Sequence, residues 1–565
     1  QQYDNAGPCR NISPKYQMNS YKSTGQPGPH EVIFLALGGV GEIGMNLYLY
    51  GHDGAWLMVD LGVSFGEDYI PGIDGVMPDP SFIKERSSTL AGLIVTHGHE
   101  DHLGAIQHLW PQLGCPVYAT GFPASLLRRK LTENGLDGVV PLKEIKCGSS
   151  LSIGPFDIKL ITLTHSIPEP NGLVIRTKAG IVVHTGDWKF DKDPVIGRAS
   201  DGAELRRIGD EGVLAMMCDS TNVLVKGVSG SEGDLKKHLQ RLISQCKNRV
   251  VVGCFASNVA RFQTIAEAAE NCGRHVVLLG RSLHRINQVA RENGLFEHLA
   301  AFVPEENSGY LPKDKVLFIC TGSQGEPRAA LARLARGDNR EVGLEPGDAV
   351  IFSSRVIPGN EVAVARLQNQ FIAKEVDVFT DGDWQIHVSG HPTREDLVTM
   401  YEYIRPQIAV PIHGEMRHLV GHSNLAKMCK VPHTVVAVNG TMLKLDPTGA
   451  HVIDHVETGR VGVDGSRLVP LDSAPMRERR RLQSSGIVFV SIVFGENREL
   501  ALQPYVSSAG LIDEIVDEEI LIDAEKRAGD VISSLSKKFM SNDGAIIEAV
   551  KREVRAVFRK AIGKK

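Results

Sequence analysis

Four residues whose side chains can bind metal ions fall within six consecutive positions of the segment THGHEDH, residues 96–102. They are His97, His99, Asp101 and His102. Residues two apart point the same way in an extended segment, so His97 and His99 can converge on one ion. Asp101 and His102 can face a second ion. Because neutral imidazole and carboxylate are ligands for ions such as zinc and manganese, the spacing predicts two adjacent metal sites.

The flanking residues indicate how these side chains are positioned. The apolar, β-branched run 92–96 predicts a buried strand, and residues 102–110 have helical spacing. The metal-binding motif therefore spans the end of a strand, a loop and the start of a helix.

Two metal sites need more than four ligands, and three later segments supply candidates. Strand-like runs end shortly before His165, Asp187 and His413. Each residue alone is equally consistent with an ordinary hydrogen-bonded polar side chain. Three strands that each deliver one candidate at the carboxyl end predict one edge of a sheet sandwich that collects ligands.

The segments THGHEDH, LTHS, HTGDW and PIHGE resemble the metallo-β-lactamase hydrolase superfamily, whose fold is a sandwich of two sheets flanked by helices. The resemblance implies two divalent ions per chain, with zinc favoured and manganese the alternative. It implies one ion on His97, His99 and His165, the other on Asp101, His102 and His413, and Asp187 bridging both. A hydroxide shared by the ions is then the nucleophile, and Asp60 supports the site from behind the ligands.

Two metal ions favour phosphodiester cleavage, because together they generate hydroxide and neutralise the charge that builds up on the phosphate. The stretch between Asp187 and His413 is far longer than a loop needs, so it predicts an inserted domain. Strands and helices alternate over roughly residues 226–375, which predicts a parallel sheet in the insert. We expect the catalytic cleft to lie between the two domains.

The insert resembles the β-CASP domain of nucleic-acid-processing nucleases. Asp219 in MMCDSTN, His391 in WQIHVSGHP and His413 in PIHGE match three motifs of that family. The resemblance implies that Asp219 and His391 together protonate the leaving oxygen, since a neighbouring carboxylate raises the pKa of an imidazole. The alternative for Asp219 is a turn or helix cap within DSTN.

Among β-CASP proteins the chain is most similar to the bacterial ribonuclease J family. LGGVGEIGMN, PGIDGVMPD, CDSTN, FASNVAR, TGSQGEP, SSRVIPGNE and HVSGHPTREDL carry this resemblance, from about residue 30 to 425. It implies single-stranded RNA as substrate, cut internally and also from 5′-monophosphate ends, in RNA maturation such as rRNA processing and in mRNA decay. It also implies self-association as a homodimer or homotetramer, with RNA-decay partners as a further expectation.

The resemblance implies a phosphate-binding loop at residues 387–391, which are His387, Val388, Ser389, Gly390 and His391. Ser257 and Asn258 of FASN are expected to face it, since several donors suit one compact anion. The alternative is a glycine-containing turn with incidental polar residues. Arg355 is a candidate phosphate contact, although a surface ion pair explains a lone arginine equally well.

Residues 39–44 spell G-x-G-x-x-G after a predicted strand, the pattern of a dinucleotide site. That site requires a helix next, whereas residues 47–60 alternate like a strand hairpin. The glycines instead favour close approach of the backbone to the metal cleft.

The composition bounds these interpretations. A length of 565 residues exceeds one core and predicts two to four domains. No apolar run reaches membrane-spanning length, so we expect no membrane contact. Nine cysteines without C-x-x-C spacing favour a reducing compartment, the cytoplasm. The net charge of −5 gives no support to nucleic-acid binding, which must depend on local positive patches and the metals.

We therefore expect an α/β chain with an N-terminal arm at 1–29, in which Met18 is a candidate natural start. The expected domains are a metallo-β-lactamase domain at 30–225 and 376–450, a β-CASP domain at 226–375, a linker at 451–478, and a C-terminal α/β domain at 479–565 that self-associates. Arg477 and Arg479–Arg481 are candidate RNA contacts, or a solvated helix face.

Two alternatives remain open. A hydrolase of small metabolites would share the metal ligands but has no use for the insert. A β-CASP DNA-processing nuclease would share the insert as well, and only the ribonuclease-like segments and the C-terminal domain argue against it. A non-catalytic scaffold would need an eroded metal motif, which here is whole.

Overall fold

The computed structural model describes residues 26–65 and 70–563 of the chain. Residues up to Ser64 together with Met77–Thr458 form one compact unit, and the residues after Thr458, with a short segment ending at Val76, form a second. The predicted N-terminal arm lies outside the described residues as far as residue 25, and so does Met18. Within the described ranges, no helix combines the length and apolarity that crossing a membrane requires.

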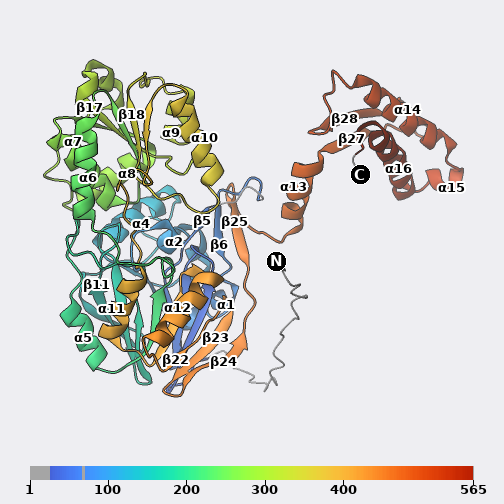
Figure 1. Ribbon diagram of the computed structural model, residues 1–565. Coiled ribbons are helices and arrows are strands. Elements are labelled where there is room, and N and C mark those ends of the chain that lie inside the picture. Colours follow the sequence, from blue (N-terminus) through green and yellow to red (C-terminus); the bar gives the residue numbers. More distant parts are fainter. Residues whose placement is uncertain (1–25, 66–69, 564–565) are drawn as a thin grey trace, which may run out of the picture. The chain divides into compact units, whose positions relative to one another are not determined.

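Two sheets form the core of the part of the first unit that we call the sandwich domain (Figure 1). One sheet has the order β24 (Gly449–His455), β23 (Thr441–Asp446), β1 (Val32–Gly38), β3 (Leu47–His52), β4 (Ala55–Val59), β7 (Leu90–Ile94), β8 (Val117–Ala119) and β9 (Leu142–Glu144). The other has the order β10 (Ser150–Ile153), β11 (Phe156–Thr162), β12 (Asn171–Thr177), β13 (Gly180–His184), β14 (Val213–Asp219), β20 (Ile408–Ile412) and β22 (His433–Thr434).

The strand β14 shows why the sandwich forms. Its residues are all buried, and successive side chains alternate between two apolar clusters. Ala215 and Met217 pack between the sheets, whereas Met216 and Cys218 pack under helices α5 (Gly202–Asp210), α11 (Arg394–Ile404) and α12 (Met416–Met428). A strand covered on both faces is apolar along its length, as this one is from Val213 to Cys218.

The glycine-rich segment 39–44 leads into strands and not into a helix, as predicted. β3 and β4 pair antiparallel, with Tyr48 opposite Val59. Gly39, Gly41 and Gly44 all have positive φ, which explains why glycine occupies these positions.

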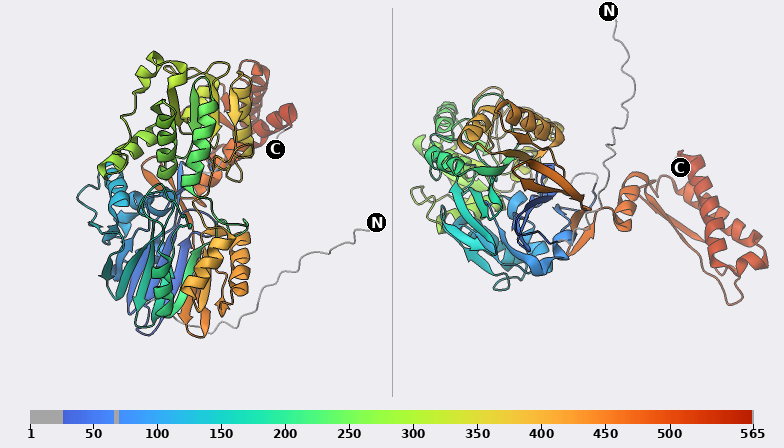
Figure 2. Two further views of the ribbon diagram at one scale, coloured as in Figure 1. Left: turned by 60° about the vertical axis from the view of Figure 1, so that its left-hand side comes forward. Right: turned by 90° about the horizontal axis from the view of Figure 1, so that it is seen from below.

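The insert forms a three-layer domain of its own, stacked on the sandwich domain (Figure 2). Its five parallel strands have the order β16 (His275–Leu279), β17 (Val316–Cys320), β15 (Val250–Gly253), β18 (Ala349–Phe352) and β19 (Asp377–Phe379). One face packs on α6 (Glu232–Gln245), α7 (Val259–Asn271) and α8 (Arg281–Glu292), and the other on α9 (Ala330–Arg336) and α10 (Glu361–Ile372). The parallel sheet was predicted, but it continues through β19, beyond the predicted boundary at residue 375.

The second unit contains β25 (Arg460–Asp464) and β26 (Arg467–Pro470), which share a small sheet with β5 (Ser64–Phe65) and β6 (Gly75–Pro78). Helix α13 (Ala474–Ser485) follows. The segment 451–478 is therefore not the linker we predicted. It holds most of β24, the β25–β26 hairpin and the start of α13. The Asp-Gly pair at 464–465 between alternating residues is a hairpin signal that the prediction missed.

The rest of the second unit contains both strands and helices, as expected of the predicted α/β domain. β27 (Ile487–Ser491) and β28 (Tyr505–Ala509) pair antiparallel, and α14 (Glu518–Ser534), α15 (Lys537–Met540) and α16 (Asp543–Ile562) follow. The apolar stripe of α16 packs against α14 and residues of this sheet in one buried cluster.

Candidate metal centre

Neighbouring strands of the seven-stranded sheet deliver candidate ligands to one edge. β13, β14 and β20 are parallel neighbours, so their carboxyl ends lie together. Asp187 follows β13, Asp219 ends β14, and His413 follows β20. Across the sandwich, β7 ends at Ile94, and His97 follows. The candidate ligands that follow strand ends in the sequence therefore lie at one edge of the fold.

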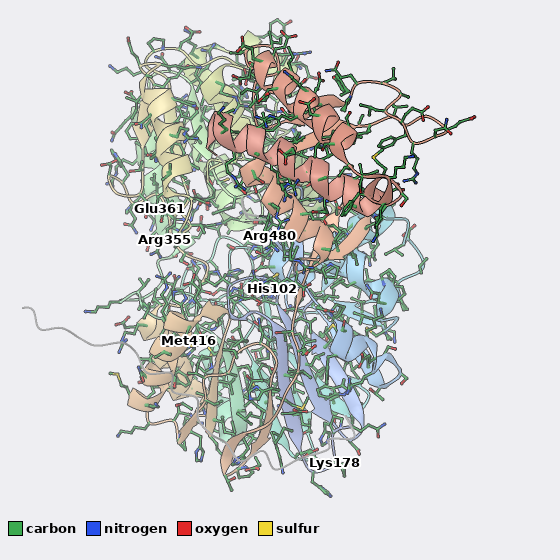
Figure 3. All side chains as sticks on the ribbon, turned by 90° about the vertical axis from the view of Figure 1, so that its right-hand side faces the viewer. His102, Lys178, Arg355, Glu361, Met416 and Arg480 are labelled. Atoms are coloured by element: carbon green, nitrogen blue, oxygen red, sulfur yellow. The ribbon has the colours of Figure 1, made fainter. Side chains whose placement is uncertain are left out.

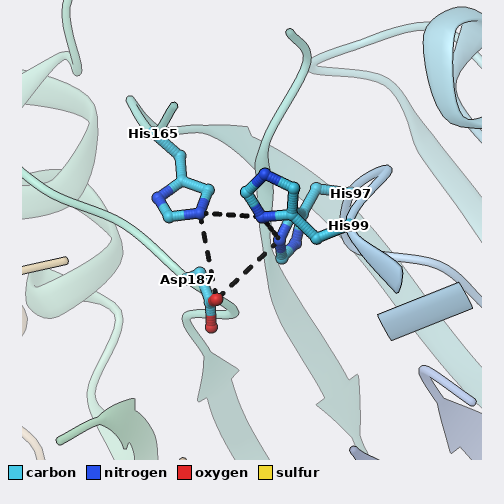
Figure 4. A group of neighbouring side chains, drawn as sticks. All are labelled: His97, His99, His165 and Asp187. Carbon is cyan, nitrogen blue, oxygen red and sulfur yellow. Dashed lines mark hydrogen bonds and ion pairs between the residues drawn. The ribbon is translucent and has the colours of Figure 1, made fainter. Parts of the chain in front are cut away.

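The side chains of His97, His99, His165 and Asp187 form a first cluster, which we call site A (Figure 4). His99 Nδ1 lies 3.1 Å from His97 Nε2 and 3.1 Å from His165 Nε2. Asp187 Oδ2 lies 3.8 Å from His97 Nε2 and 3.9 Å from His165 Nε2. Three imidazoles and one carboxylate thus direct ligand atoms into one small volume.

A second cluster, site B, contains Asp101, His102, Asp187 and His413. His102 Nε2 lies 3.4 Å from Asp101 Oδ2 and 3.2 Å from Asp187 Oδ2. His413 Nδ1 lies 3.6 Å from Asp187 Oδ1, and its Nε2 lies 3.8 Å from Asp101 Oδ2. Asp187 belongs to both clusters, which is the arrangement expected of a bridging ligand.

The residues fit divalent metal ions. Asp187 Oδ1 is buried and has no hydrogen-bond partner among the described residues. A carboxylate oxygen left in that state is costly unless a ligand satisfies it. Imidazole and carboxylate donors suit zinc and manganese alike, so this set does not choose between the two.

Residues behind the ligands hold their rings in place. Asp60 Oδ2 lies 2.7 Å from His102 Nδ1, and the Asp60 carboxylate also accepts hydrogen bonds from the backbone N–H and hydroxyl of Thr96, both at 2.8 Å. Asp60 therefore has the supporting position we expected. Asn46 was not predicted: its Oδ1 lies 3.0 Å from His413 Nδ1, and its Nδ2 donates to the Asp101 carbonyl at 2.9 Å. An asparagine carries no sequence signal of this role, because the role depends on contacts across the fold.

The backbone at this edge is shaped for the site. A side chain at Gly39 would meet Asn46 Oδ1 at 2.2 Å and the Tyr48 hydroxyl at 2.5 Å. The Tyr48 hydroxyl donates to Asn46 Oδ1 at 2.7 Å, so the missing side chain makes room for the pair that supports His413. His413 itself has a φ of +51°, a strained value that a buried histidine adopts only where its surroundings fix it.

Burial and charge set the protonation of the ligands. Burial lowers the pKa of His97 and of His165 well below the usual value, with the neighbouring imidazoles acting in the same direction. These rings are therefore neutral and offer lone pairs to an ion. Burial opposes the charged form of His102 as well, but the carboxylates of Asp187, Asp101 and Asp60 raise its pKa.

Asp219 and His391 form a close pair beside site A and site B. Asp219 Oδ2 lies 2.7 Å from His391 Nδ1, and Asp187 Oδ2 lies 3.9 Å from the same nitrogen. Burial opposes the charged form of His391, but the carboxylates of Asp219 and Asp187 outweigh it and raise its pKa to about 9. The other Asp219 oxygen accepts from the backbone N–H of Thr221, so the carboxylate has the turn role as well as the histidine contact.

The loop at 387–391 is fastened by residues that we did not predict. Asn222 Nδ2 donates to Ser389 Oγ at 2.6 Å. Arg261, which is fully buried, donates to the carbonyls of Ile386 and Val388, each at 3.3 Å. Hydrogen bonds from Asn222 and from Arg261 of α7 therefore hold the loop in place.

Three cationic side chains lie near one end of this loop, and Arg261 and Lys189 among them are paired with carboxylates. Burial lowers the pKa of His387 well below its usual value, and the cations Arg261, Arg355 and Lys189 lower it further. Arg355 is exposed and its side chain is thus accessible to an anion, whereas Arg261 is paired with Glu232 at 2.6 Å.

Ser257 and Asn258 lie at the start of α7, where FASN approaches site A. The Ser257 carbonyl lies 3.3 Å from His99 Nε2. The side-chain oxygen of Asn258 accepts from the Arg261 N–H at 2.8 Å and caps the helix. Asn258 thus has a structural role that the phosphate-binding expectation did not include.

Figure 3 labels residues of both domains. Arg355 and Glu361 belong to the inserted domain, Met416 belongs to the sandwich domain, and His102 is at the level between them.

Two of the candidate RNA-binding arginines of the second unit have local partners: Arg479 pairs with Asp464 at 2.7 Å, and Arg480 donates to the Leu471 carbonyl at 3.2 Å. They lie on α13, whose residues are mostly exposed, which agrees with a solvated helix face.

Four family models match the chain. They are a beta-lactamase superfamily domain over residues 71–206, the beta-CASP domain of ribonuclease J over 247–371, a Zn-dependent metallo-hydrolase RNA specificity domain over 384–436, and a ribonuclease J C-terminal domain over 475–565.

Curated relatives match over most of their length. Ribonuclease J of Sinorhizobium meliloti is 44% identical, covering 95% of this chain and 96% of that protein. Ribonuclease J 1 of Streptococcus pyogenes is 35% identical, covering 93% and 95% respectively. Ribonuclease J of Thermus thermophilus is 35% identical, covering 84% of each.

A solved structure also shares the fold. A crystal structure of a protein of unknown function from Enterococcus faecalis aligns with a TM-score of 0.52 over 74% of this chain and 100% of that chain. At 17% sequence identity this similarity concerns the fold alone.

Proposed function

Because the chain belongs to the ribonuclease J family of metal-dependent ribonucleases, we propose that it cleaves single-stranded RNA at sites A and B, both internally and from 5′-monophosphate ends. The observation that carries this proposal is the position of the loop 387–391 against the ligand clusters. The Gly390 carbonyl lies 2.5 Å from His165 Nδ1, and His391 Nδ1 lies 3.9 Å from Asp187 Oδ2. A phosphate held by this loop would therefore lie next to the cleavage site.

In this proposal site A and site B would each hold one divalent ion, and Asp187 would be a ligand common to both sites. Zinc is favoured, and manganese is the alternative. Ions bound here supply the Lewis acidity that activates water and neutralises the charge accumulating on the phosphodiester.

The chain's own residues supply the rest of the chemistry. Asp219 holds His391 in its protonated form, and His391 donates that proton to the leaving oxygen of the scissile bond. Ser389 and the backbone N–H groups of its loop bind the terminal 5′-phosphate, with Arg355 and the positive charge around His387 favouring the anion. An RNA that lacks a 5′-end in this pocket is cut internally at the same centre.

At the level of the cell and the assembly, we propose a cytoplasmic enzyme of RNA maturation and decay that self-associates as a homodimer or homotetramer through its C-terminal domain, residues 479–565 in the sequence prediction. The match of residues 475–565 to the ribonuclease J C-terminal domain supports this assignment.

The test uses one sequence in three forms: 5′-monophosphate RNA, 5′-triphosphate RNA and single-stranded DNA, each with and without chelator. We expect fast 5′-to-3′ digestion of the monophosphate RNA, internal cleavage of both RNAs, little cleavage of DNA, and none with chelator. Equal digestion of DNA would favour a DNA-processing nuclease, and activity that survives chelation would contradict the metal mechanism.

A further inference from the structure

The orientation of His165 depends on a backbone carbonyl from a distant part of the chain. His165 Nδ1 lies 2.5 Å from the Gly390 carbonyl oxygen. A carbonyl only accepts hydrogen bonds, so Nδ1 must carry the proton. Nε2 then carries the lone pair, and it faces site A, 3.1 Å from His99 Nδ1. The contact thus selects the tautomer that can bind a metal ion.

Gly390 has no side chain for a steric reason. A Cβ at this position would lie 2.7 Å from His165 Cε1 and 2.8 Å from His165 Nδ1. The next atom it would meet, Ser166 Cβ, is at 3.3 Å, a tight contact that a shift of a few tenths of an ångström would relieve. The main conflict therefore concerns the His165 ring, and backbone conformation adds nothing to it because the φ of Gly390 is not positive.

The carbonyl is held in place by bonds that do not involve His165. Asn222 Nδ2 donates to Ser389 Oγ on one side of Gly390. The Ser229 hydroxyl donates to the His391 carbonyl at 3.0 Å on the other side. Gly390 is therefore a fixed acceptor that orients the ring, and not a mobile group that follows it.

His99 has an equivalent support from the inserted domain. Its Nε2 lies 3.3 Å from the Ser257 carbonyl, while its Nδ1 faces the other ligands of site A. Two of the three site A imidazoles are thus oriented by backbone carbonyls, one from the loop 387–391 and one from the inserted domain. Those of site B are supported from within the sandwich domain, by Asp60 and Asn46.

From this geometry we infer that Gly390 is a positioning residue for metal binding at site A: its carbonyl fixes His165 as a ligand, and its missing side chain leaves room for the ring. The loop that we propose binds the 5′-phosphate thereby also completes a metal site. This inference rests on the proposed function of sites A and B.

The test is the metal affinity of Gly390→Ala, measured on the full chain by competition with a chromogenic chelator for Zn²⁺ and for Mn²⁺. Loss of an outer support lowers metal affinity by about 10- to 100-fold. We expect that loss at one of two sites, together with a lower kcat. Gly382→Ala is the matched control, since its Cβ would meet only Thr380 Oγ1, at 3.6 Å. Unchanged affinity in Gly390→Ala would overturn the inference.

A double-mutant cycle with His165→Ala separates positioning from general misfolding. Removing the imidazole also removes the atoms that the new Cβ would meet, so Gly390→Ala should change neither metal affinity nor the unfolding temperature further in that background. Additive losses would show that Gly390 acts through something other than His165. If His165→Ala itself leaves metal affinity unchanged, the proposed metal site fails, which is a separate result.

Discussion

Single carboxylates determine much of the chemistry at the residue scale. Asp187 lies within 3.9 Å of imidazole nitrogens on five residues, which are His97, His102, His165, His391 and His413. One side chain thus lies beside site A, site B and His391, the proposed proton donor. Asp219 acts more locally, since its contact with His391 raises the pKa of that ring.

The role of Asp219 gives the first prediction. Replacing Asp219 with Asn keeps the shape but removes the charge that raises the pKa of His391. General acid catalysis contributes about 10²- to 10⁴-fold, so we expect kcat for RNA cleavage to fall within that range. Metal content should stay at the wild-type value. Asp137→Asn, at an exposed position, is the control; a kcat for Asp219→Asn equal to that of the control would exclude the proton-donor role.

A second residue-scale prediction concerns the choice of RNA end. Ser389→Ala removes a hydroxyl from the proposed phosphate pocket, so we expect weaker use of 5′-monophosphate ends and little change in internal cleavage. The measurement is the ratio of the two rates on one RNA carrying either a monophosphate or a triphosphate. Equal loss of both activities would refute the pocket. Ser466→Ala, in an exposed hairpin turn, is the control.

Sequence alone predicted the residues whose types are rare and regularly spaced. The histidines and aspartates of sites A and B all meet in the structure, as expected from their positions after strands. Asn46, Asn222 and Arg261 were missed, because asparagine and arginine are common and nothing local marks them. Their roles arise only when segments far apart in the chain come together.

At the scale of elements, the buried arginine of α7 links the inserted domain to the loop 387–391. Arg261 pairs with Glu232 of α6 at 2.6 Å and also donates to the Ser353 carbonyl after β18 at 2.9 Å. All these groups are buried, so the arginine holds a helix pair, a strand end and the loop in one arrangement.

Breaking this pair should be costly. Arg261→Met leaves the buried Glu232 carboxylate unpaired, and removing one partner of a buried ion pair destabilises by about 3–5 kcal/mol. Chemical denaturation should show that loss. The exposed pair of Arg285 and Glu133 provides the control, since Arg285→Met should change stability by about 1 kcal/mol or less. Similar losses in both variants would mean that Arg261 is not a structural centre.

Asp191, in the loop that follows β13, predicts a pH dependence of stability. Asp191 is buried; burial opposes its charge, but Lys189 at 2.9 Å and the Glu232 backbone N–H hold its pKa below the usual range. A carboxyl whose pKa is lower in the folded state stabilises above its unfolded pKa, and this contribution is lost as the pH falls through the folded value. The difference in unfolding free energy between wild type and Asp191→Asn should therefore shrink from pH 6 to pH 3. A constant difference would contradict the account.

Element prediction succeeded where periodicity was strong and failed where strands were short. The alternating strands and helices of the insert gave its parallel sheet. The β25–β26 hairpin was taken for a linker, because its strands are only five and four residues long. The predicted insert ends before β19 for a similar reason, since a strand of three residues carries almost no hydrophobic pattern.

At the scale of the whole molecule, the chain leaves the sandwich domain after β14, builds the inserted domain, and returns to deliver His391 and His413. The site therefore combines strand ends of one domain with loops of another. This explains why no single segment of the sequence identifies the substrate, and why the resemblance to known families was needed to predict RNA. With a net charge of −5, the RNA binding that we propose must depend on local groups, among which Arg355 is a candidate, and not on bulk charge.

The central claim is that RNA is cleaved at two metal ions that share Asp187. The most direct measurement is to strip the full chain of metal, add back Mn²⁺ or Zn²⁺ in steps, and follow both bound ions by native mass spectrometry and cleavage of 5′-monophosphate RNA. We expect the wild-type chain to bind two ions and its activity to rise to a plateau as the second ion binds. We expect Asp187→Ala to show neither the second bound ion nor the rise in activity. RNA cleavage by the metal-free protein, or by Asp187→Ala at the wild-type rate, would contradict the central claim.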